Sequence, residues 1–359
     1  MKAVVRPLVD TDLEGFDRLR TLVYPDRPET FDTDRYFSIW RWLGTHPLED
    51  QMHRWVVATE EGEVVGHLAA LPQFYRISHQ RVVAHTPADY MVLPEYGFHA
   101  VTLMRKFFRT CENCVACDVA PAAISVETGL GAKGVERLQH AARLQNVAGL
   151  PAFPTSIPVS LTRLFNLGLR AVDRALTATI LVDHLRVEVL EGFDETFDEF
   201  FESVAAGVAC VPEKDAAFLR WRYSPDSPNS PVTVLGVREG DALLGYAVLW
   251  VKPGGDTPRY ASNLLDLMTR PGRDDVARAL LKGAIEHFAR AGVYIIRYRF
   301  LESPTSPRTK DVWRLGFLPR AGRRHTLLVK FADHNLHKVA LDPANWSYTT
   351  GDGEASFFF

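Results

Sequence analysis

Long apolar runs are missing from this sequence, and cysteines are few. No stretch approaches the roughly 20 consecutive apolar residues that a membrane-spanning helix needs. The N-terminal MKAVVRPLVDTDLEG lacks the longer apolar core and the small-residue cleavage site of a secretory signal peptide. Four cysteines in 359 residues do not make the disulfide framework of a small secreted protein. We therefore expect a cytoplasmic protein with reduced thiols and no membrane contact.

An excess of positive charge is missing too. The net charge is −3, so the composition indicates no basic surface for a nucleic-acid backbone, and we expect no nucleic-acid partner. Apolar residues make up 47% of the chain and charged residues 24%, which is ordinary for a globular protein. A chain of 359 residues is too long for one small core, and its length favours two domains.

Three of the four cysteines, Cys111, Cys114 and Cys117, follow one another at a spacing of three. This spacing raises the question of a metal or iron–sulfur site. However, residues 114–119 read as a strand, in which successive side chains point to opposite faces, so the thiolates could not converge on one tetrahedral ion. The remaining cysteine, Cys210, lies in the other half of the chain. We predict that the cysteines pack in the interior and that the protein binds no metal.

The two halves of the chain repeat each other. A Trp-Arg-aromatic trio shortly before a proline occurs in IWRWLGTHP (39–47) and again in LRWRYSPDSP (219–228). Each is followed by a strand–turn–strand pattern, at 54–71 and 232–250, whose polar turn is typical of a β-hairpin. The Trp-Arg stretches either dock a helix on the hairpin or line a pocket for an anionic group.

The repeat continues beyond the hairpins. Each returning strand contains a glycine, Gly66 or Gly245, and a glycine within a strand marks a bulge or a close backbone approach. Each half then has a short apolar strand, an amphipathic helix and a further strand, at 89–94, 100–110 and 114–119, and at 264–271, 276–292 and 294–300. Corresponding landmarks lie roughly 180 residues apart, which predicts a duplicated α/β domain.

The proline-rich stretch PAFPTSIPVS predicts a linker between the two copies. We place the first domain at 1–150, a linker and helix at 151–180, the second domain at 181–333 and a C-terminal extension at 334–359. Because a duplicated chain can form its twofold arrangement internally, we expect a monomer with an internal pseudo-twofold axis.

This order of elements resembles the GNAT superfamily of acyl-CoA-dependent N-acetyltransferases. More specifically, it is similar to tandem GNAT-like proteins whose second half opens with an LRWRY…P stretch. The resemblance covers nearly the whole chain in element order. It implies an α/β protein of two GNAT-like domains, each a twisted mixed, mostly antiparallel sheet flanked by helices.

In that family a loop of the form [RQ]-x-x-G-x-[GA] after the splayed strand binds the pyrophosphate of acetyl-CoA, because backbone N–H groups and the positive end of a helix converge there. In the first half, Gly97, Phe98 and Ala100 stand where the family has Arg, Gly and Gly. The resemblance implies that acetyl-CoA, or another acyl-CoA, contacts Met91, Val92, Leu93, Gly97, Phe98, His99, Ala100 and Val101.

The corresponding loop of the second half carries Asp274 and Asp275 just ahead of the helix. Carboxylates suit a helix N-terminus, but they would repel a pyrophosphate. We therefore assign the coenzyme to the first half.

GNAT enzymes usually place a Tyr, the acid for the departing thiolate, three residues before a Leu-Gly-Phe turn. Here that count reaches Glu127 in the first half and Val312 in the second. Glu127 could act as an acid or base if burial raised its pKa, or it could cap a helix. Asp89 stands where a GNAT base often acts, or it bonds a neighbouring loop. His85 is the nearby group whose unperturbed pKa lies near neutrality, or it is structural.

The resemblance implies an acyl-CoA-dependent N-acyltransferase acting on an amine of a small molecule, sugar or peptide. Two alternatives stay open. The degenerate loops and missing tyrosines suit a binding or scaffold protein that has lost the coenzyme. Tandem GNAT-like folds also serve aminoacyl-tRNA-dependent transfer, but that function calls for a basic channel.

Overall fold

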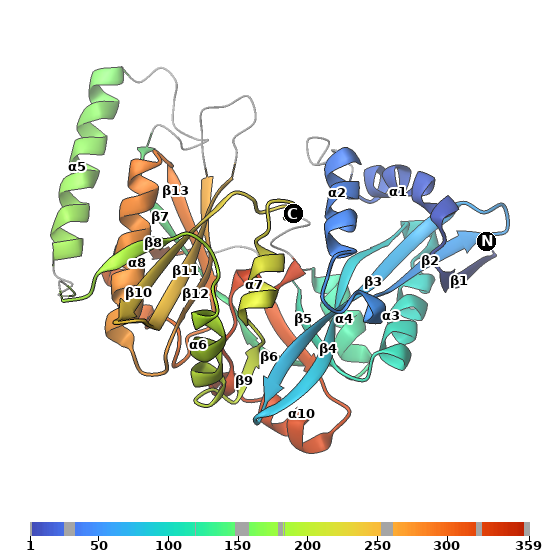
Figure 1. Ribbon diagram of the computed structural model, residues 1–359. Helices are drawn as coiled ribbons and strands as arrows, with labels where there is room; N and C mark the ends of the chain where they lie inside the picture. Colours follow the sequence, from blue (N-terminus) through green and yellow to red (C-terminus); the bar gives the residue numbers. More distant parts are fainter. Residues whose placement is uncertain are drawn as a thin grey trace.

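The computed structural model describes residues 2–24, 33–118, 120–147, 158–178, 182, 184–252, 261–320 and 325–354. Two β-sheets flanked by helices lie side by side in it (Figure 1). The linker prediction for residues 151–157 lies outside the described part of the chain, whereas the residues that follow form helix α5 (Val159–Ala178).

The first sheet has the strand order β1-β2-β3-β4-β5-β15-β6, and β9 pairs with β3. Its strands are β1 (Ala3–Pro7), β2 (His53–Thr59), β3 (Val64–Ile77), β4 (Gln80–Val92), β5 (Cys114–Asp118), β15 (Thr326–Lys330), β6 (Lys133–Arg137) and β9 (Cys210–Pro212). Helices α1 (Phe16–Val23), α2 (Thr33–Leu43), α3 (Phe98–Thr110), α4 (Pro121–Gly129) and α10 (His334–Ala340) surround it. Among its described strand pairs, β4 and β5 alone run parallel.

The second sheet repeats this plan in the order β14-β7-β13-β12-β11-β10-β8. Its strands are β14 (Leu318–Pro319), β7 (Gln139–Leu144), β13 (Ile295–Phe300), β12 (Ala261–Thr269), β11 (Ala242–Lys252), β10 (Val232–Glu239) and β8 (Val187–Leu190). Its helices are α6 (Thr196–Ala205), α7 (Ala216–Arg222), α8 (Asp274–Arg290) and α9 (Thr309–Arg314). Here β12 and β13 form the parallel pair, so the prediction of mixed, mostly antiparallel sheets is confirmed.

The two halves exchange strands. β15, from the second half of the chain, pairs antiparallel with β5 and β6 of the first sheet. In return β7, from the first half, pairs antiparallel with β13 and β14 of the second sheet. Neither sheet is therefore built from one half of the chain alone, although the sequence repeat divides near residue 150.

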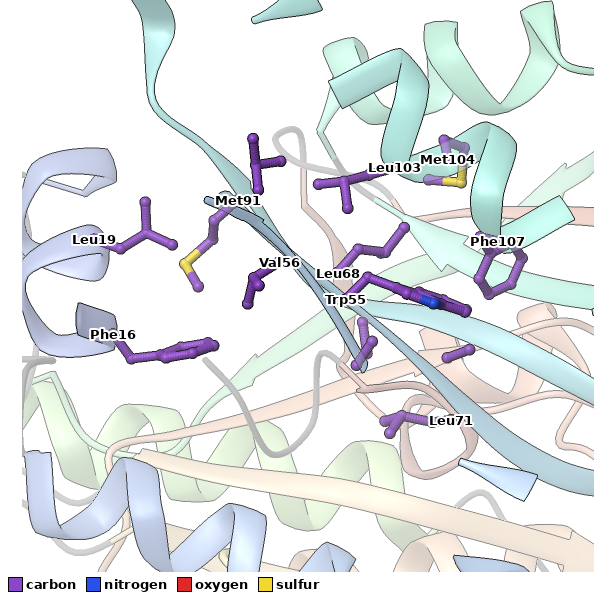
Figure 2. Packing of buried hydrophobic residues seen from close by; sticks show 14 of the residues in the cluster. Phe16, Leu19, Trp55, Val56, Leu68, Leu71, Met91, Leu103, Met104 and Phe107 are labelled. Carbon is purple, nitrogen blue, oxygen red and sulfur yellow. The ribbon is translucent and has the colours of Figure 1, made fainter. Parts of the chain in front are cut away.

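The repeated glycines lie where two strands approach closely. A Cβ on Gly66 would lie 2.9 Å from Val57 Cγ2, and a Cβ on Gly245 would lie 2.9 Å from the Met268 carbonyl oxygen. The close approach predicted for both glycines is confirmed. It lets α3 and the first hairpin share one core with Leu68, Met91 and Leu103 (Figure 2).

The repeated Trp-Arg stretches join the halves. Trp42 of α2 stacks on Trp221 of α7 with ring centroids 4.6 Å apart and planes 6° apart. Each indole N–H donates to the other residue's carbonyl oxygen, at 3.1 Å from Trp42 and 3.4 Å from Trp221. This reciprocal contact is what a local twofold axis between two copies produces.

A buried ion cluster ties the C-terminal tail, residues 346–354, to the second sheet. Lys214 Nζ lies 2.9 Å from Asp266 Oδ1 and 2.8 Å from Asp352 Oδ1, and all three side chains are almost fully buried. Thr349 Oγ1 donates to Asp266 at 3.2 Å. Two buried carboxylates therefore depend on one ammonium group.

Replacing Lys214 by alanine should destabilise the protein by roughly 3–5 kcal/mol, because it leaves two buried carboxylates without their cation. Urea unfolding at pH 7 measures the change. As a control, Arg238→Ala breaks ion pairs at the exposed side chains of Glu188 and Asp194 and should cost about 1 kcal/mol or less. Equal effects of the two variants would contradict this account of the cluster.

Candidate functional site

The end of β4 carries a bulge at Asp89. Leu68 of β3 faces both Asp89 and Tyr90 across the ladder, and Asp89 has a φ of 50°. Its carboxylate accepts from Arg20 at 2.8 Å and from the Tyr36 hydroxyl. His67 Nδ1 lies 3.2 Å from the second carboxylate oxygen. The carboxylate is thus bonded on both oxygens.

Burial opposes ionisation of Asp89, yet the hydrogen bond from His67 and the charge of Arg20 hold its pKa below the usual value. A carboxylate of low pKa is a weak base. Asp266 repeats the arrangement in the second sheet, with Lys214 and Tyr246 as partners. The recurrence in both halves favours a structural role, in which the aspartate fixes the bulge at the end of the central strand.

His85 lies four residues earlier on β4, at the point where β4 meets β5. Its Nε2 lies 3.0 Å from the Gln51 carbonyl oxygen, and its ring stacks 6.0 Å from that of His53. Burial lowers the pKa of His85, and the hydrogen bond to Gln51 opposes the shift without reversing it. The ring therefore faces the short helix at Glu49–Gln51, and a structural role fits it best.

Beyond His85 the strands β4 and β5 separate. Their ladder consists of the single pair His85 and Cys114, supported by the Thr86 hydroxyl, which donates to the Val115 carbonyl at 2.8 Å. Further along, the Asp89 amide donates to Glu354 Oε2 of the tail at 3.3 Å. The edge of β4 that faces β5 is therefore open to a partner other than a strand.

The loop after β4 leads directly into α3. Gly97 is the N-terminal cap and provides no side-chain hydrogen bond. The N–H groups of Phe98 and His99 donate to no other described residue. Phe98 is 77% exposed, whereas Met91 and Leu93 are buried in the core. Val92, His99, Ala100 and Val101 are half-buried.

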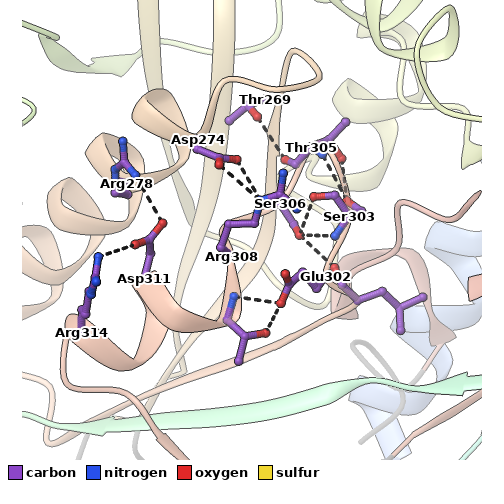
Figure 3. A network of polar contacts seen from close by, with 12 residues as sticks. Thr269, Asp274, Arg278, Glu302, Ser303, Thr305, Ser306, Arg308, Asp311 and Arg314 are labelled. Carbon is purple, nitrogen blue, oxygen red and sulfur yellow. Dashed lines mark hydrogen bonds and ion pairs between the residues drawn. The ribbon is translucent and has the colours of Figure 1, made fainter. Parts of the chain in front are cut away.

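The corresponding loop of the second half is closed by its own chain (Figure 3). The Thr269 amide donates to the Thr305 carbonyl and the Gly272 amide to the Pro304 carbonyl, both at 2.9 Å. Arg308 Nε bonds the carboxylate of Asp274 at 3.2 Å. These amides come before α8, and the carboxylates of Asp274 and Asp275 lie in the first turn of that helix, where they would repel a phosphate.

Glu127 lies near the end of α4 and is 1% exposed. Neither of its carboxylate oxygens has a hydrogen-bond partner among the described residues. Burial raises the pKa of Glu127 to about 8, and the charge of Asp118 adds to the shift. The carboxyl group is therefore neutral at pH 7 and can donate a proton.

Tyr90 and Glu354 were not predicted from the sequence. The Tyr90 hydroxyl is buried without a partner among the described residues, and burial together with the charge of Glu127 raises its pKa. Burial also raises the pKa of Glu354, whose carboxylate lies at the β4 edge. GNAT enzymes usually have a tyrosine three residues before the Leu-Gly-Phe turn, where this chain has Glu127; Tyr90 comes from the bulge of β4.

The cysteines pack in two cores. Cys111 and Cys114 belong to the core of the first sheet, whereas Cys117 and Cys210 belong to the core where the tail packs. Burial raises the pKa of Cys111 and of Cys210 to about 12. Among the described residues, no three His, Cys, Asp or Glu side chains are placed to hold a metal ion. Nor does any helix in that part of the chain have the length and apolarity needed to cross a membrane.

Two cavities lie between the halves. One, of about 780 Å³, is lined by the β6–β7 corner, by residues 301–304 and by Trp313 and Arg308. A smaller one, of about 40 Å³, is lined by Thr86, Trp221 and Glu354 among others. The smaller cavity borders the gap between β4 and β5.

No model of a protein family matches the sequence, and no curated protein sequence matches it either. Solved structures do match. A GCN5-related N-acetyltransferase from Anabaena variabilis aligns with a TM-score of 0.58 at 14% identity, over 92% of this chain and 73% of that one. The fold is GNAT-like.

Other GNAT-like structures extend the comparison. Saccharomyces cerevisiae N-myristoyltransferase with bound myristoyl-CoA aligns with a TM-score of 0.58 at 10% identity, over 92% of this chain and 80% of that one. A GCN5-related N-acetyltransferase from Kribbella flavida aligns with a TM-score of 0.55 at 12% identity, over 93% of this chain and 72% of that one. The fold predicted from the repeated element order is confirmed, and at these identities the likeness concerns the fold alone.

Replacing Glu127 by glutamine should stabilise the protein increasingly as pH rises from 4.5, the ordinary pKa of Glu, to about 8. Below that range the carboxyl is protonated in the folded and unfolded states alike, so the variants should be equally stable. Within it the unfolded chain loses a proton that the folded chain keeps. The free energy of unfolding of the wild type therefore falls, relative to that of the variant, by up to about 1.4 kcal/mol per pH unit. Urea unfolding across pH 4–9 measures this, with exposed Glu136→Gln as control. A difference independent of pH would contradict the buried, neutral state.

Proposed function

We propose that this protein is an acyl-CoA-dependent N-acyltransferase whose first half binds the coenzyme. The observation that carries the proposal is the contrast between the helix starts that follow the two central strands. The first turn of α3 carries no acidic residue, and the N–H groups of Phe98 and His99 donate to no other described residue. The first turn of α8 carries Asp274 and Asp275, and the Thr269 and Gly272 amides before it are bonded to their own half of the chain. The enzyme class is that of the GNAT-fold transferases to which the structure is similar.

The pyrophosphate would lie at the N-terminus of α3. Free N–H groups and the helix dipole favour an anion there, and small residues at Gly97 and Ala100 let it approach the backbone. The pantetheine would run along the open edge of β4, beside Tyr90. We propose acetyl-CoA as the co-substrate; the myristoyl-CoA bound by the yeast enzyme shows that a similar fold also accepts long acyl chains.

Acyl transfer to an amine forms a C–N bond and breaks the C–S bond of the thioester. The departing thiolate takes up a proton, and the attacking amine loses one. Glu127, neutral because its pKa lies at about 8, can provide the proton for the thiolate. Tyr90, whose hydroxyl also has no partner among the described residues, is the second candidate acid. At the high pH at which Tyr90 titrates, Glu127 is ionised, and burial together with that nearby charge raises the pKa of Tyr90.

One observation favours a second candidate function, a non-catalytic binding protein. The Glu354 carboxylate already accepts from the Asp89 amide in the gap between β4 and β5. If the tail keeps this position, it would shorten the channel that a pantetheine arm needs. Turnover of acetyl-CoA in the presence of an amine distinguishes the two functions.

Calorimetric titration of the full chain with coenzyme A and with acetyl-CoA tests the coenzyme site. Saturable binding is expected, and Ala100→Asp should abolish it, because a carboxylate at the start of α3 would repel the pyrophosphate. Asp275→Asn, in the corresponding loop of the second half, is the control and should leave the affinity unchanged. No heat at millimolar ligand, or loss of binding in the control alone, would contradict the assignment to the first half.

Glu127→Gln should lower kcat by about 100-fold or more, the usual contribution of a general acid, with little change in coenzyme affinity. The wild-type rate should fall as pH rises through about 8, because Glu127 then loses the proton it donates. Steady-state rates of thiol release measure both. If Tyr90→Phe has the larger effect and the pH profile stays flat, the acid is Tyr90 and the assignment to Glu127 is wrong.

A further inference from the structure

The second sheet carries a row of basic side chains on the face opposite α8. We propose that this row, Arg299, His140 and Arg320 with Arg297 beside it, binds a carboxylate or phosphate group of the amine acceptor. The inference rests on the proposed acyltransferase function and extends it, since it names the class of acceptor: an amine that also carries an anionic group.

The row follows from the strand register. His140 of β7 pairs with Arg299 of β13, and Ala142 pairs with Arg297. On the other side of β7, Leu318 pairs with Ala142, and the Arg320 amide donates to the His140 carbonyl at 2.8 Å. Residues paired across a sheet point to the same face, so the four side chains share one face. The opposite face, with Tyr298 and Phe300, packs against α8.

No acid balances the row. None of its three arginines forms an ion pair with another described residue, and Arg299 Nε and both ring nitrogens of His140 lack hydrogen-bond partners there. Burial, together with the charges of Arg299, Arg320 and Arg297, lowers the pKa of His140 to about 4, so this ring is neutral at pH 7. Burial and the charges of Arg297 and Arg320 also lower the pKa of Arg299. An anion held among the three arginines would offset their mutual repulsion.

The row lies next to the gap between β4 and β5. The Thr350 hydroxyl of the tail donates to the Arg299 carbonyl at 3.2 Å. Three residues later Gly353 lies against β5, where a Cβ on it would be 3.6 Å from the Cβ of Cys117. Glu354 then reaches the Asp89 amide. Since four residues of extended chain span at most about 14 Å, the row and the β4 edge lie within the length of one small acceptor.

The side chains indicate what the row would recognise. A guanidinium presents a planar fork of donors that matches carboxylate and phosphate oxygens, and adjacent strands are about 4.8 Å apart. Arg299 and Arg320 flank His140 from opposite sides and would hold one such group between them. Arg297 and Arg299 are half-buried and Arg320 is exposed, so a solute can reach the row.

Matched acceptors test the proposal. With acetyl-CoA, the rate of thiol release is compared for glycine and glycinamide and for glucosamine 6-phosphate and glucosamine. The anionic member of at least one pair should have a kcat/KM about tenfold or more above its neutral partner, the strength of a hydrogen bond to a charged group. The pair that shows the preference tells a carboxylate acceptor from a phosphate acceptor. Equal rates within both pairs would overturn the proposal.

The variants Arg299→Gln and Arg320→Gln should remove the preference by raising KM for the anionic acceptor, with KM for acetyl-CoA unchanged. Arg109→Gln, at the exposed end of α3, is the control and should keep the preference. If the preference for the anionic acceptor remains in both row variants, another site binds the anion.

A measurement without coenzyme separates this proposal from the acyltransferase assignment. Inorganic phosphate is titrated into the full chain while the His140 ring is followed by NMR; saturable shifts that vanish in the Arg299→Gln, Arg320→Gln double variant support the row. If phosphate binds in this way while coenzyme A does not bind, the acyltransferase assignment fails and the anion site stands. If coenzyme A binds but the His140 ring does not respond to phosphate, the anion site fails alone.

Discussion

A buried aspartate three residues before the end of each central strand is the contact on which this structure depends. Asp89 in β4 and Asp266 in β12 each accept hydrogen bonds from the preceding strand of the hairpin, through His67 or Tyr246, and from a cation, Arg20 or Lys214. Each thereby fixes the place where the central strand turns away from its parallel neighbour. Without that separation, neither half could admit a ligand along the strand edge.

The two copies use the separation differently. In the second half, Asp266 shares Lys214 with Asp352, and the loop at Pro304 and Thr305 bonds the amides at the end of β12. The second gap is therefore filled by the protein and serves stability. In the first half the Asp89 amide on the separated edge donates to Glu354 of the tail, and the N–H groups of Phe98 and His99 donate to no other described residue. The two halves thus differ in how far the gap beside the central strand is closed by the chain itself.

The sequence predicted those parts of the structure that depend on local pattern. The alternation of a strand, with a period of two, predicts the hairpins and the opposite faces of Cys114 and Cys117. The lack of a side chain on glycine predicts the close approaches at Gly66 and Gly245. The repeat of these landmarks was enough to predict the fold. Glu127 was found by counting back from a turn, and the possibility that burial raises its pKa was inferred before its environment was known.

The exchange of β7 and β15 could not be predicted in this way. Both strands would complete either sheet with the same alternation, because the two sheets are copies, so only the tertiary pairing decides between them. The net charge of −3 likewise gave no indication of the basic row, because the row forms only through tertiary strand pairing. Arg297 and Arg299 lie on one strand, but His140 and Arg320 reach them only because β7 has moved to the second sheet.

This exchange also explains why the row could arise at the junction. When β7 pairs with the second sheet, its residue His140 joins a face on which β13 already places Arg297 and Arg299. His140 thereby lies between arginines from two different elements, beside a tail that runs back to the open edge of β4. A single GNAT-like domain would keep its last strand and would present no such row. The proposed acceptor site therefore needs strands from both halves of the chain, whereas the proposed coenzyme site lies within the first half.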